Sequence, residues 1–352
     1  MKQYSIAVLL PHLEVFGGIR RYLALGGLWS AWGHAVTLRT ATGQPPDWTP
    51  FAGRVERHDA ASPGVPFDVA FTPQPALLPR LRELPAARRV YYCVLEGEPG
   101  EGAALRDPGL TLMANSGALV ARLARAARRP VLDGVGGIDP AFFHPDRSAR
   151  APGKLSILAY GRRSRPKKGT DLIVRAVESI APRFPTLELV LFDHVGPGNE
   201  TDPRTGFAAK IPVRFELNRT QEELARLYAA ADVFVAAEKK AGWCNTAIEA
   251  MSAGCALVCT PSGTRDFARH DETAWVVPVR HPWFLARGLA RVLGDNALRT
   301  RLEAAGPAAV RPFAWEVLAA KIFDQLGMSD GVPEHVRKRP QTPSELVAPD
   351  SV

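Results

Sequence analysis

A chain of 352 residues is too long for one ordinary hydrophobic core and predicts two domains. Its net charge of +8 favours anionic partners, namely a nucleotide diphosphate, an acidic membrane surface or nucleic acid, and composition does not choose among them. The apolar run near the N-terminus is too short to span a membrane, and no small-residue cleavage site follows it. We therefore expect a first strand there rather than a signal peptide.

The cysteines are interpreted as reduced thiols of a cytoplasmic protein. No two of them have the paired spacing of metal ligands, and three lie in or beside predicted buried strands or the central loop. A zinc site is therefore not expected; the four residues are Cys93, Cys244, Cys255 and Cys259.

The N-terminal half begins with a βαβ pattern. Residues 4–10 form an apolar run that predicts a strand, Gly17 and Gly18 then open a helix over residues 19–32, and residues 36–39 predict a second strand. The glycine pair would let a ligand approach the backbone, although a plain tight turn uses glycines as often. Further strands are expected at residues 54–57, 68–71, 89–94 and 110–114, which together indicate a parallel sheet covered by helices.

A basic amphipathic helix is predicted over residues 117–129. Its arginines lie beside apolar residues, so the helix could rest on anionic lipid, but a charge run is more often only a solvated face. The four arginines are Arg122, Arg125, Arg128 and Arg129.

A glycine- and proline-rich crossing follows, and we place a domain boundary between residues 143 and 154. A second α/β set begins at residues 155–160 and ends in two helices near residues 283–305, followed by an amphipathic helix over residues 313–328. Residues 329–352 are rich in proline and charge with few large apolar side chains, which predicts a disordered tail.

The second half is organised around residues 231–254, which read ADVFVAAEKKAGWCNTAIEAMSAG. A buried strand at 232–236 leads through a loop into a helix from Asn245, which Asn245 or Thr246 can cap. The amides at such a helix start bind anions at the carboxyl edge of α/β sheets. Glu249, one turn into the helix, could accept hydrogen bonds from ribose hydroxyls, or could be a solvated acid favoured by the helix dipole.

A second candidate site is the basic loop GRRSRPKKG at residues 161–169, which joins a strand to a helix. Arg162 offers a planar fork and Lys168 a point charge, a combination that suits a diphosphate. The loop taken alone is equally consistent with a basic surface that binds RNA or nothing.

These motifs, in this order, resemble those of family 4 glycosyltransferases. The resemblance covers residues 4–327 and rests on GRRSRPKKGTD, the Gly17-Gly18 turn, NSGALVARL, DGVGGIDPAFFHP, and AGWCNTAIEAMSAGCALVCTPSGTRDF followed by DETAWVVP. It implies the α/β GT-B fold, in which two Rossmann-like, doubly wound parallel-sheet domains face each other across a cleft. The implied domains are an acceptor domain at 1–148, a nucleotide-sugar donor domain at 149–312, and a helix at 313–328 that packs back toward the first domain.

The resemblance also assigns roles to individual residues. Arg162 and Lys168 correspond to the pair that holds the donor diphosphate, and Glu249 to the acid that binds the nucleotide ribose. Gly17 and Gly18 would lie against the donor phosphate. Further donor-binding candidates are the helix-start residues Asn245 and Thr246, and Arg265, which together with Asp266 could equally form a simple surface pair.

Two positions depart from the family pattern. Ala241 stands where the family has a glutamate that contacts the donor sugar, while Glu238 is near but out of register. Losing a charged partner in a buried sugar pocket would cost about 2–3 kcal/mol for a hexose that needs it. Either the donor sugar is deoxy or otherwise modified, or Glu238 takes the place of the missing glutamate. The second departure is at YYCVLEGEP, where many relatives carry a histidine and this chain has Glu96 and Glu98. Candidate sugar contacts are Glu98, Glu238 and Trp243.

The resemblance implies a retaining glycosyltransferase that moves a sugar from a nucleotide-diphosphate donor to a glycan, lipid-linked or small-molecule acceptor. Cell-envelope polysaccharide or glycoconjugate synthesis in the cytoplasm is expected, with peripheral contact to the inner face of the membrane as one possibility. Asp193 and Asp232 have no neighbouring acid, so neither a metal nor another cofactor is expected. An inactive nucleotide-binding relative that serves as a partner subunit is the alternative. Nucleic-acid binding is disfavoured because aromatic residues do not alternate with the basic ones.

Overall fold

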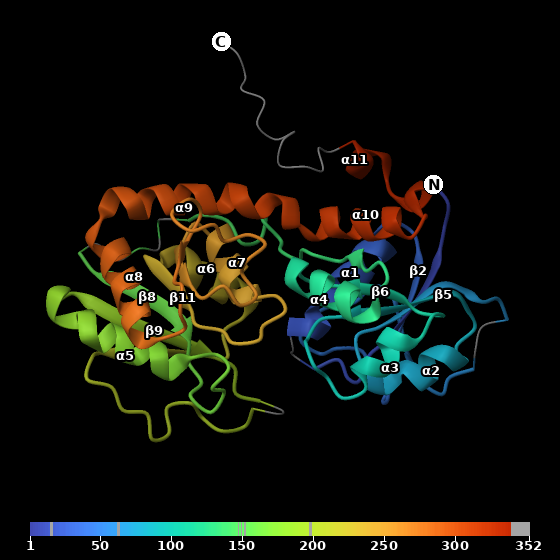
Figure 1. Cartoon of the computed structure of the whole chain (residues 1–352), viewed down its shortest axis with the longest axis horizontal. Coiled ribbons are helices and arrows are strands. Elements are labelled where there is room, and N and C mark those ends of the chain that lie inside the picture. The colour runs from blue at the N-terminus through green and yellow to red at the C-terminus, as the bar shows by residue number, and fades with distance from the viewer. Residues whose placement is uncertain are drawn as a thin grey trace, which may run out of the picture. The chain divides into compact units, whose positions relative to one another are not determined.

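The computed structural model describes residues 1–14, 17–61, 64–146, 148, 150, 153–196 and 199–338. It divides the chain into two units, Met1–Gly137 together with the chain from Pro312, and Ile138–Arg311 (Figure 1). The predicted boundary at residue 148 therefore lies too late. The segment after Ile138 belongs to the second unit because Phe143 is fully buried there, and its carbonyl accepts a 2.5 Å bond from the Ser252 hydroxyl.

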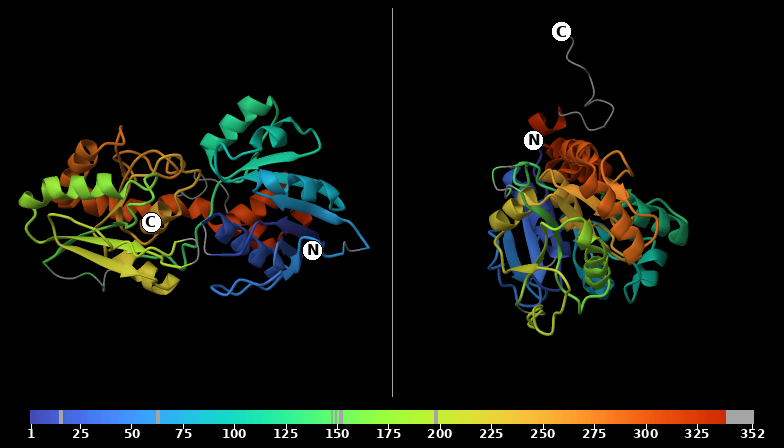
Figure 2. Two further views of the ribbon diagram at one scale, coloured as in Figure 1. Left: turned by 90° about the horizontal axis from the view of Figure 1, so that it is seen from below. Right: turned by 90° about the vertical axis from the view of Figure 1, so that its left-hand side faces the viewer.

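The first unit is built on a seven-stranded parallel sheet of order β3-β2-β1-β4-β5-β6-β7. Alternate residues of β1 enter different cores: Ile6 and Val8 pack with α1 and α10, while Ala7 and Leu9 pack with α2, α3 and α4. Both faces are thus covered by helices, which explains the continuous apolar runs of the strands (Figure 2). The elements are β1 (Ser5–Leu9), α1 (Gly17–Ala31), β2 (Ala35–Thr40), β3 (Arg54–Arg57), β4 (Phe67–Thr72), α2 (Leu78–Glu83), β5 (Ala86–Cys93), α3 (Glu101–Arg106), β6 (Thr111–Ala114), α4 (Gly117–Ala127) and β7 (Leu132–Asp133).

The second unit has a six-stranded parallel sheet of order β10-β9-β8-β11-β12-β13. On one face of this sheet, Ile157, Val233 and Val258 of three strands pack in one core with α5 and α8. The residue after Val233 on β11, Phe234, packs edge-on against Tyr228 of α6. The elements are β8 (Leu155–Tyr160), α5 (Thr170–Ile180), β9 (Leu187–Asp193), β10 (Val213–Leu217), α6 (Gln221–Ala230), β11 (Val233–Ala236), α7 (Asn245–Ser252), β12 (Ala256–Cys259), β13 (Trp275–Val276), α8 (Pro282–Gly294) and α9 (Asn296–Val310).

Helix α10 (Trp315–Gln325) is part of the first unit although it lies near the end of the chain. It packs along α1, and Figure 1 shows the two helices side by side. Phe323 stacks on Trp29, whose other ring neighbour is Phe71 of β4, with centroid distances of 5.6 and 5.7 Å. This aromatic stack joins the chain's C-terminal part to the first sheet.

The prediction of a disordered tail from residue 329 is wrong for residues 329–338. They form a 3-10 turn, Ser329–Gly331, and the short helix α11 (Glu334–Arg337). Val332 and Val336 are 2% and 3% exposed, because apolar residues spaced by four continue from Met328 into the first core. The His34 ring also bonds the Gly331 carbonyl at 2.9 Å. The remainder of the predicted tail, 339–352, lies outside the described residues.

Candidate active site

In the second unit, two loops meet at the carboxyl ends of β8 and β11. The Lys239 amide donates to the Lys167 carbonyl at 2.8 Å, and Arg280 donates to the carbonyls of Pro166 and Ala237 at 2.6 and 2.7 Å. The basic loop is thereby fixed against the loop that precedes α7.

Gly169 allows this close approach of the loops. Its φ is +79°, and a β-carbon there would lie 2.5 Å from the Ala237 carbonyl oxygen. Only glycine fits this position without a shift of the backbone.

Lys168 lies inside this junction and pairs with Glu238. Its Nζ is 2.5 Å from Glu238 Oε1 and 5.3 Å from the centre of the Tyr160 ring. Burial alone would lower the pKa of the Lys168 ammonium, but the opposite charge of Glu238 outweighs it and the pKa is raised. Lys168 is therefore firmly protonated, and its ammonium has donors beyond the one that faces Glu238.

Arg162 is buried, with 3% of its surface exposed. Its Nε donates to Asp193 Oδ2 at 2.6 Å, and its Nη atoms donate to the carbonyls of Thr201, His194 and Asn199 at 2.7, 3.2 and 3.3 Å. The two cations that sequence reasoning assigned to one diphosphate are thus each paired with a separate carboxylate. Asp193 was missed as a site residue, and its place at the carboxyl end of β9 was the available signal.

Glu249 is buried within α7. It is 4% exposed, and its Oε2 accepts a 3.0 Å bond from the Tyr228 hydroxyl. The alternative of a solvated first-turn acid is therefore wrong. Since Glu249 lies one turn inside a helix that starts at the carboxyl edge of the sheet, the ribose-binding role remains a prediction.

The expected helix caps are also wrong. Asn245 and Thr246 are the first two residues of α7, and the N-cap position is Cys244, whose side chain makes no capping bond. The Cys244 amide instead donates to the Gly263 carbonyl at 2.9 Å, which fixes where the helix begins.

Position 241 packs against the loop after β12. The Ala241 amide donates to the Ser262 hydroxyl at 2.9 Å, and a β-carbon on Gly263 would lie 2.8 Å from the Ala241 methyl. Trp243 is 8% exposed and stacks edge-on with Phe267 at 5.1 Å, so its ring is largely covered. Arg265 is exposed.

The remaining candidates lie in the first unit. Gly17 and Gly18 form the first turn of α1 rather than a turn before it, and residues 15 and 16 lie outside the described part of the chain. Glu98 is half-buried, and burial followed by the nearby Glu101 raises its carboxyl pKa. Glu101 binds Arg122 of α4 through two bonds of 2.6 and 2.9 Å.

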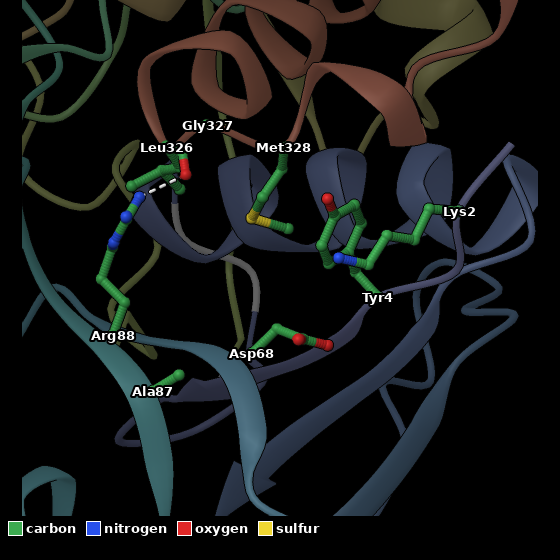
Figure 3. Close-up of a pocket in the computed structure, with 8 residues that line it drawn as sticks. All are labelled: Lys2, Tyr4, Asp68, Ala87, Arg88, Leu326, Gly327 and Met328. Carbon is green, nitrogen blue, oxygen red and sulfur yellow. Dashed lines mark hydrogen bonds between the residues drawn. The ribbon is translucent and has the colours of Figure 1, made fainter.

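A pocket of about 210 Å³ in the first unit does not contain any of the predicted site residues. It lies at the amino ends of β1, β4 and β5, where residues 326–328 form one wall (Figure 3). Its lining residues are Lys2, Tyr4, Asp68, Ala87, Arg88, Leu326, Gly327 and Met328.

The four cysteines are free and buried. Burial raises the pKa of the Cys93, Cys244 and Cys259 thiols to about 12, which makes them poor nucleophiles at neutral pH. Within the described ranges, no cluster of three or more histidine, cysteine or acidic side chains is arranged to hold a metal ion. Over the same residues, we find no helix with the length and apolarity that crossing a bilayer requires.

Comparison with known proteins finds relatives of the second unit. Residues 154–295, which include Lys168, Glu238 and Glu249, match the family model described as Glycosyl transferases group 1. Phosphatidyl-myo-inositol mannosyltransferase of Mycobacterium tuberculosis is 31% identical over 176 residues, which are 48% of this chain and 46% of the relative. The chain thus spans about half the length of the curated relatives it matches.

The fold extends the likeness to both units. Sucrose-phosphate synthase of Thermosynechococcus elongatus superposes with a TM-score of 0.75 at 20% identity, covering 93% of this chain and 99% of that one. Anabaena Alr3699/HepE in complex with UDP-glucose gives a TM-score of 0.70 at 14% identity, with 92% and 99% covered. These likenesses confirm the predicted GT-B fold class, with two Rossmann-like parallel-sheet units. Through residues 154–295 the chain is related to the group 1 glycosyltransferases.

Proposed function

We propose that the protein is a retaining glycosyltransferase that moves a sugar from a nucleotide-diphosphate donor to a glycan, lipid-linked or small-molecule acceptor. The observation that carries the proposal is the position of Lys168. It is a charged ammonium held at the carboxyl edge of the second sheet, within the segment that matches the group 1 family. Such a cation neutralises a leaving diphosphate and lowers the barrier to an oxocarbenium-like transition state.

In this proposal the residues of the second unit have distinct tasks. Lys168 binds the diphosphate, and Glu249 accepts hydrogen bonds from the ribose hydroxyls while Tyr228 fixes one of its oxygens. Arg162 stabilises the basic loop through its ion pair with Asp193. Arg162 could contact the diphosphate only by giving up its present hydrogen bonds to backbone carbonyls. The charge is supplied by side chains, so we propose that donor binding does not depend on a metal ion.

The name of one relative supports a lipid-linked acceptor. It is named a phosphatidyl-myo-inositol mannosyltransferase, and one solved neighbour binds UDP-glucose, so we propose a hexose-type or modified-hexose donor. Peripheral contact with an anionic membrane is part of the proposal. Arg122 of α4 is occupied by Glu101, and Arg129, just after the helix, by backbone carbonyls. This leaves such contact to Arg125 of α4 and to Arg128 at its C-cap, which are both exposed.

The test is a calorimetric titration of the protein with UDP, GDP, ADP, TDP and CDP, each with and without magnesium. We expect selective micromolar binding of one diphosphate, unchanged by magnesium. Lys168→Gln should weaken that binding by about 10- to 100-fold, because it removes one charge-assisted hydrogen bond to the diphosphate. The glutamine amide can still donate to Glu238, so this variant keeps the internal contact.

A matched control is Lys154→Gln, which removes an exposed charge at the amino end of the same strand β8. It should bind the diphosphate like the unmodified protein. Equal affinity in Lys168→Gln and the control would remove Lys168 from the site. Failure of every diphosphate to bind would contradict the proposed function itself.

A further inference from the structure

Three lysines border the phosphate-binding junction without any internal partner in the described structure. Lys167, Lys239 and Lys240 are exposed, and none of their ammonium groups takes part in a hydrogen bond or ion pair with the described residues. Lys167 and Lys239 belong to the two loops that are joined by the 2.8 Å backbone bond. Like charges are thus concentrated at the edge of the proposed donor site.

The acids near these lysines are already engaged by other cations. Glu238 pairs with Lys168, and Asp171 pairs with Arg163 at 2.8 Å. Asp193, on the neighbouring strand, pairs with Arg162. Arg280 is held by two backbone carbonyls, and Arg165 of the basic loop donates to Asn199 Oδ1 at 3.3 Å. The lysines therefore contribute uncompensated positive charge, which attracts an anion from solution.

The backbone at Lys240 supports a functional reason for this arrangement. Its φ is +60°, a left-handed conformation that a residue with a β-carbon adopts at a cost and that is concentrated at ligand-binding sites. The next residue is Ala241, at the position where the resembling family has a carboxylate. Position 241 itself therefore carries no carboxylate, and two lysines, Lys239 and Lys240, precede it.

We propose that Lys167, Lys239 and Lys240 bind a second anionic group of the substrate, next to the donor diphosphate. The group is a carboxylate or phosphate, carried either by the transferred sugar, as in a uronic acid, or by the acceptor. Ammonium groups bind such groups as point charges and tolerate either geometry. The inference rests on the proposed function, since it places the lysines beside the diphosphate that Lys168 binds.

The experiment compares donors that differ by one carboxylate. UDP-glucuronate and UDP-glucose, or GDP-mannuronate and GDP-mannose if guanine is the selected base, are titrated into the unmodified protein and into Lys239→Gln/Lys240→Gln. If the sugar carries the anion, the acidic donor binds the unmodified protein about tenfold more tightly, and the double variant loses this preference. Its affinity for the plain diphosphate stays within about twofold. Lys154→Gln/Lys210→Gln, which removes two exposed lysine charges elsewhere in the unit, is the matched control and keeps the preference.

A second arm tests the acceptor as the source of the anion. Inositol phosphate and inositol are titrated into protein saturated with the selected diphosphate. The lysines belong to the acceptor site if the unmodified protein binds inositol phosphate more tightly than inositol, if Lys239→Gln/Lys240→Gln loses this difference, and if the first arm shows no preference for the acidic donor. Two outcomes overturn the inference: an unchanged result in both arms, or an equal loss of affinity for the plain diphosphate, which would assign the lysines to the diphosphate itself. If no diphosphate binds the unmodified protein, the proposed function fails and this inference fails with it.

Discussion

Arg162 and Asp193 form a buried ion pair, with 4% and 1% of their side chains exposed. Removing one member of such a pair leaves the other charge buried without compensation, which costs far more than the pair itself contributes. Replacing Arg162 by alanine would therefore destabilise the second unit and would not test diphosphate binding alone. The side chain of Lys168 is 34% exposed, so Lys168 is the better residue for a binding test.

We expect Arg162→Ala to lower the free energy of unfolding by about 3–5 kcal/mol, measured by urea denaturation. Arg163→Ala is the control, because its partner Asp171 is 59% exposed and pairs of that kind contribute only about 0–1 kcal/mol. Removing both charges in Arg162→Met/Asp193→Leu should recover part of the loss. Unfolding of Arg162→Ala at the same urea concentration as the unmodified protein would show that the pair is not buried in solution.

His34 makes the stability of the first unit depend on pH. Its Nδ1 accepts from the Tyr4 amide at 3.2 Å, so Nε2 carries the proton and donates to the Gly331 carbonyl. Burial lowers the pKa of the imidazole below its usual 6.5, and the bond to Gly331 offsets only part of this. The folded protein therefore favours neutral His34. The contribution of neutral His34 to the free energy of unfolding is complete above pH 6.5. It is lost as the pH falls from there toward the lower pKa of the folded state.

We accordingly expect the Tm to fall between pH 7.5 and pH 5.5, and to fall less in His34→Gln. His58, whose pKa is also lowered by burial, will keep part of the pH dependence in that variant. The exposed His335 provides the control, since His335→Gln should follow the unmodified protein. Identical pH profiles for His34→Gln and the control would contradict the role given to His34.

At the scale of elements, the segment from Leu326 to Val336 acts as a strap on the first unit. Leu326, Met328, Val332 and Val336 are all at most 5% exposed, and Lys2 bonds the Asp330 carbonyl through its amide. The sequence analysis missed the part of this segment from Ser329 onward, because its apolar residues are few and are spaced by four among prolines and charges. Composition counts the apolar residues of this segment, whereas their packing on the first core depends on how they are spaced.

Met328→Ala should destabilise the first unit by about 2–5 kcal/mol, the usual result of truncating a buried side chain of this size. The matched control is Leu95→Ala, at a side chain that is 48% exposed, where the change should stay within about 0.5 kcal/mol. Equal midpoints of urea unfolding for the two variants would mean that the strap does not pack on the core in solution.

The strands, in contrast, could be read from the sequence. A parallel sheet covered on both faces produces short continuous apolar runs, and β1, β8 and β11 each carry one. The loops between them were harder, because the N-cap of α7 is Cys244 rather than Asn245, and this depends on a bond to Gly263. The partners of Lys168 and Arg162 lie 70 and 31 residues further along the chain, so no local pattern could reveal them.

At the scale of the whole molecule, the fold class was predictable and the electrostatics of the site were not. The order of motifs indicates two Rossmann-like units, and the solved neighbours confirm that class. The net charge of +8 predicts an anionic partner, yet the two cations that the motif selects are both neutralised by carboxylates. Beside this site, exposed positive charge lies on Lys167, Lys239 and Lys240, to which the motifs assigned no role.

The first unit is discontinuous, since Met1–Gly137 is completed only by the chain from Pro312. On the ribosome, the strands of the first sheet emerge early, but the face covered by Leu318, Ile322 and Phe323 stays bare until α10 leaves the exit tunnel. The second unit is contiguous and can close its core sooner. The half of the protein that is synthesised first is therefore the last to finish folding, and its uncovered face is where a nascent-chain chaperone would be needed.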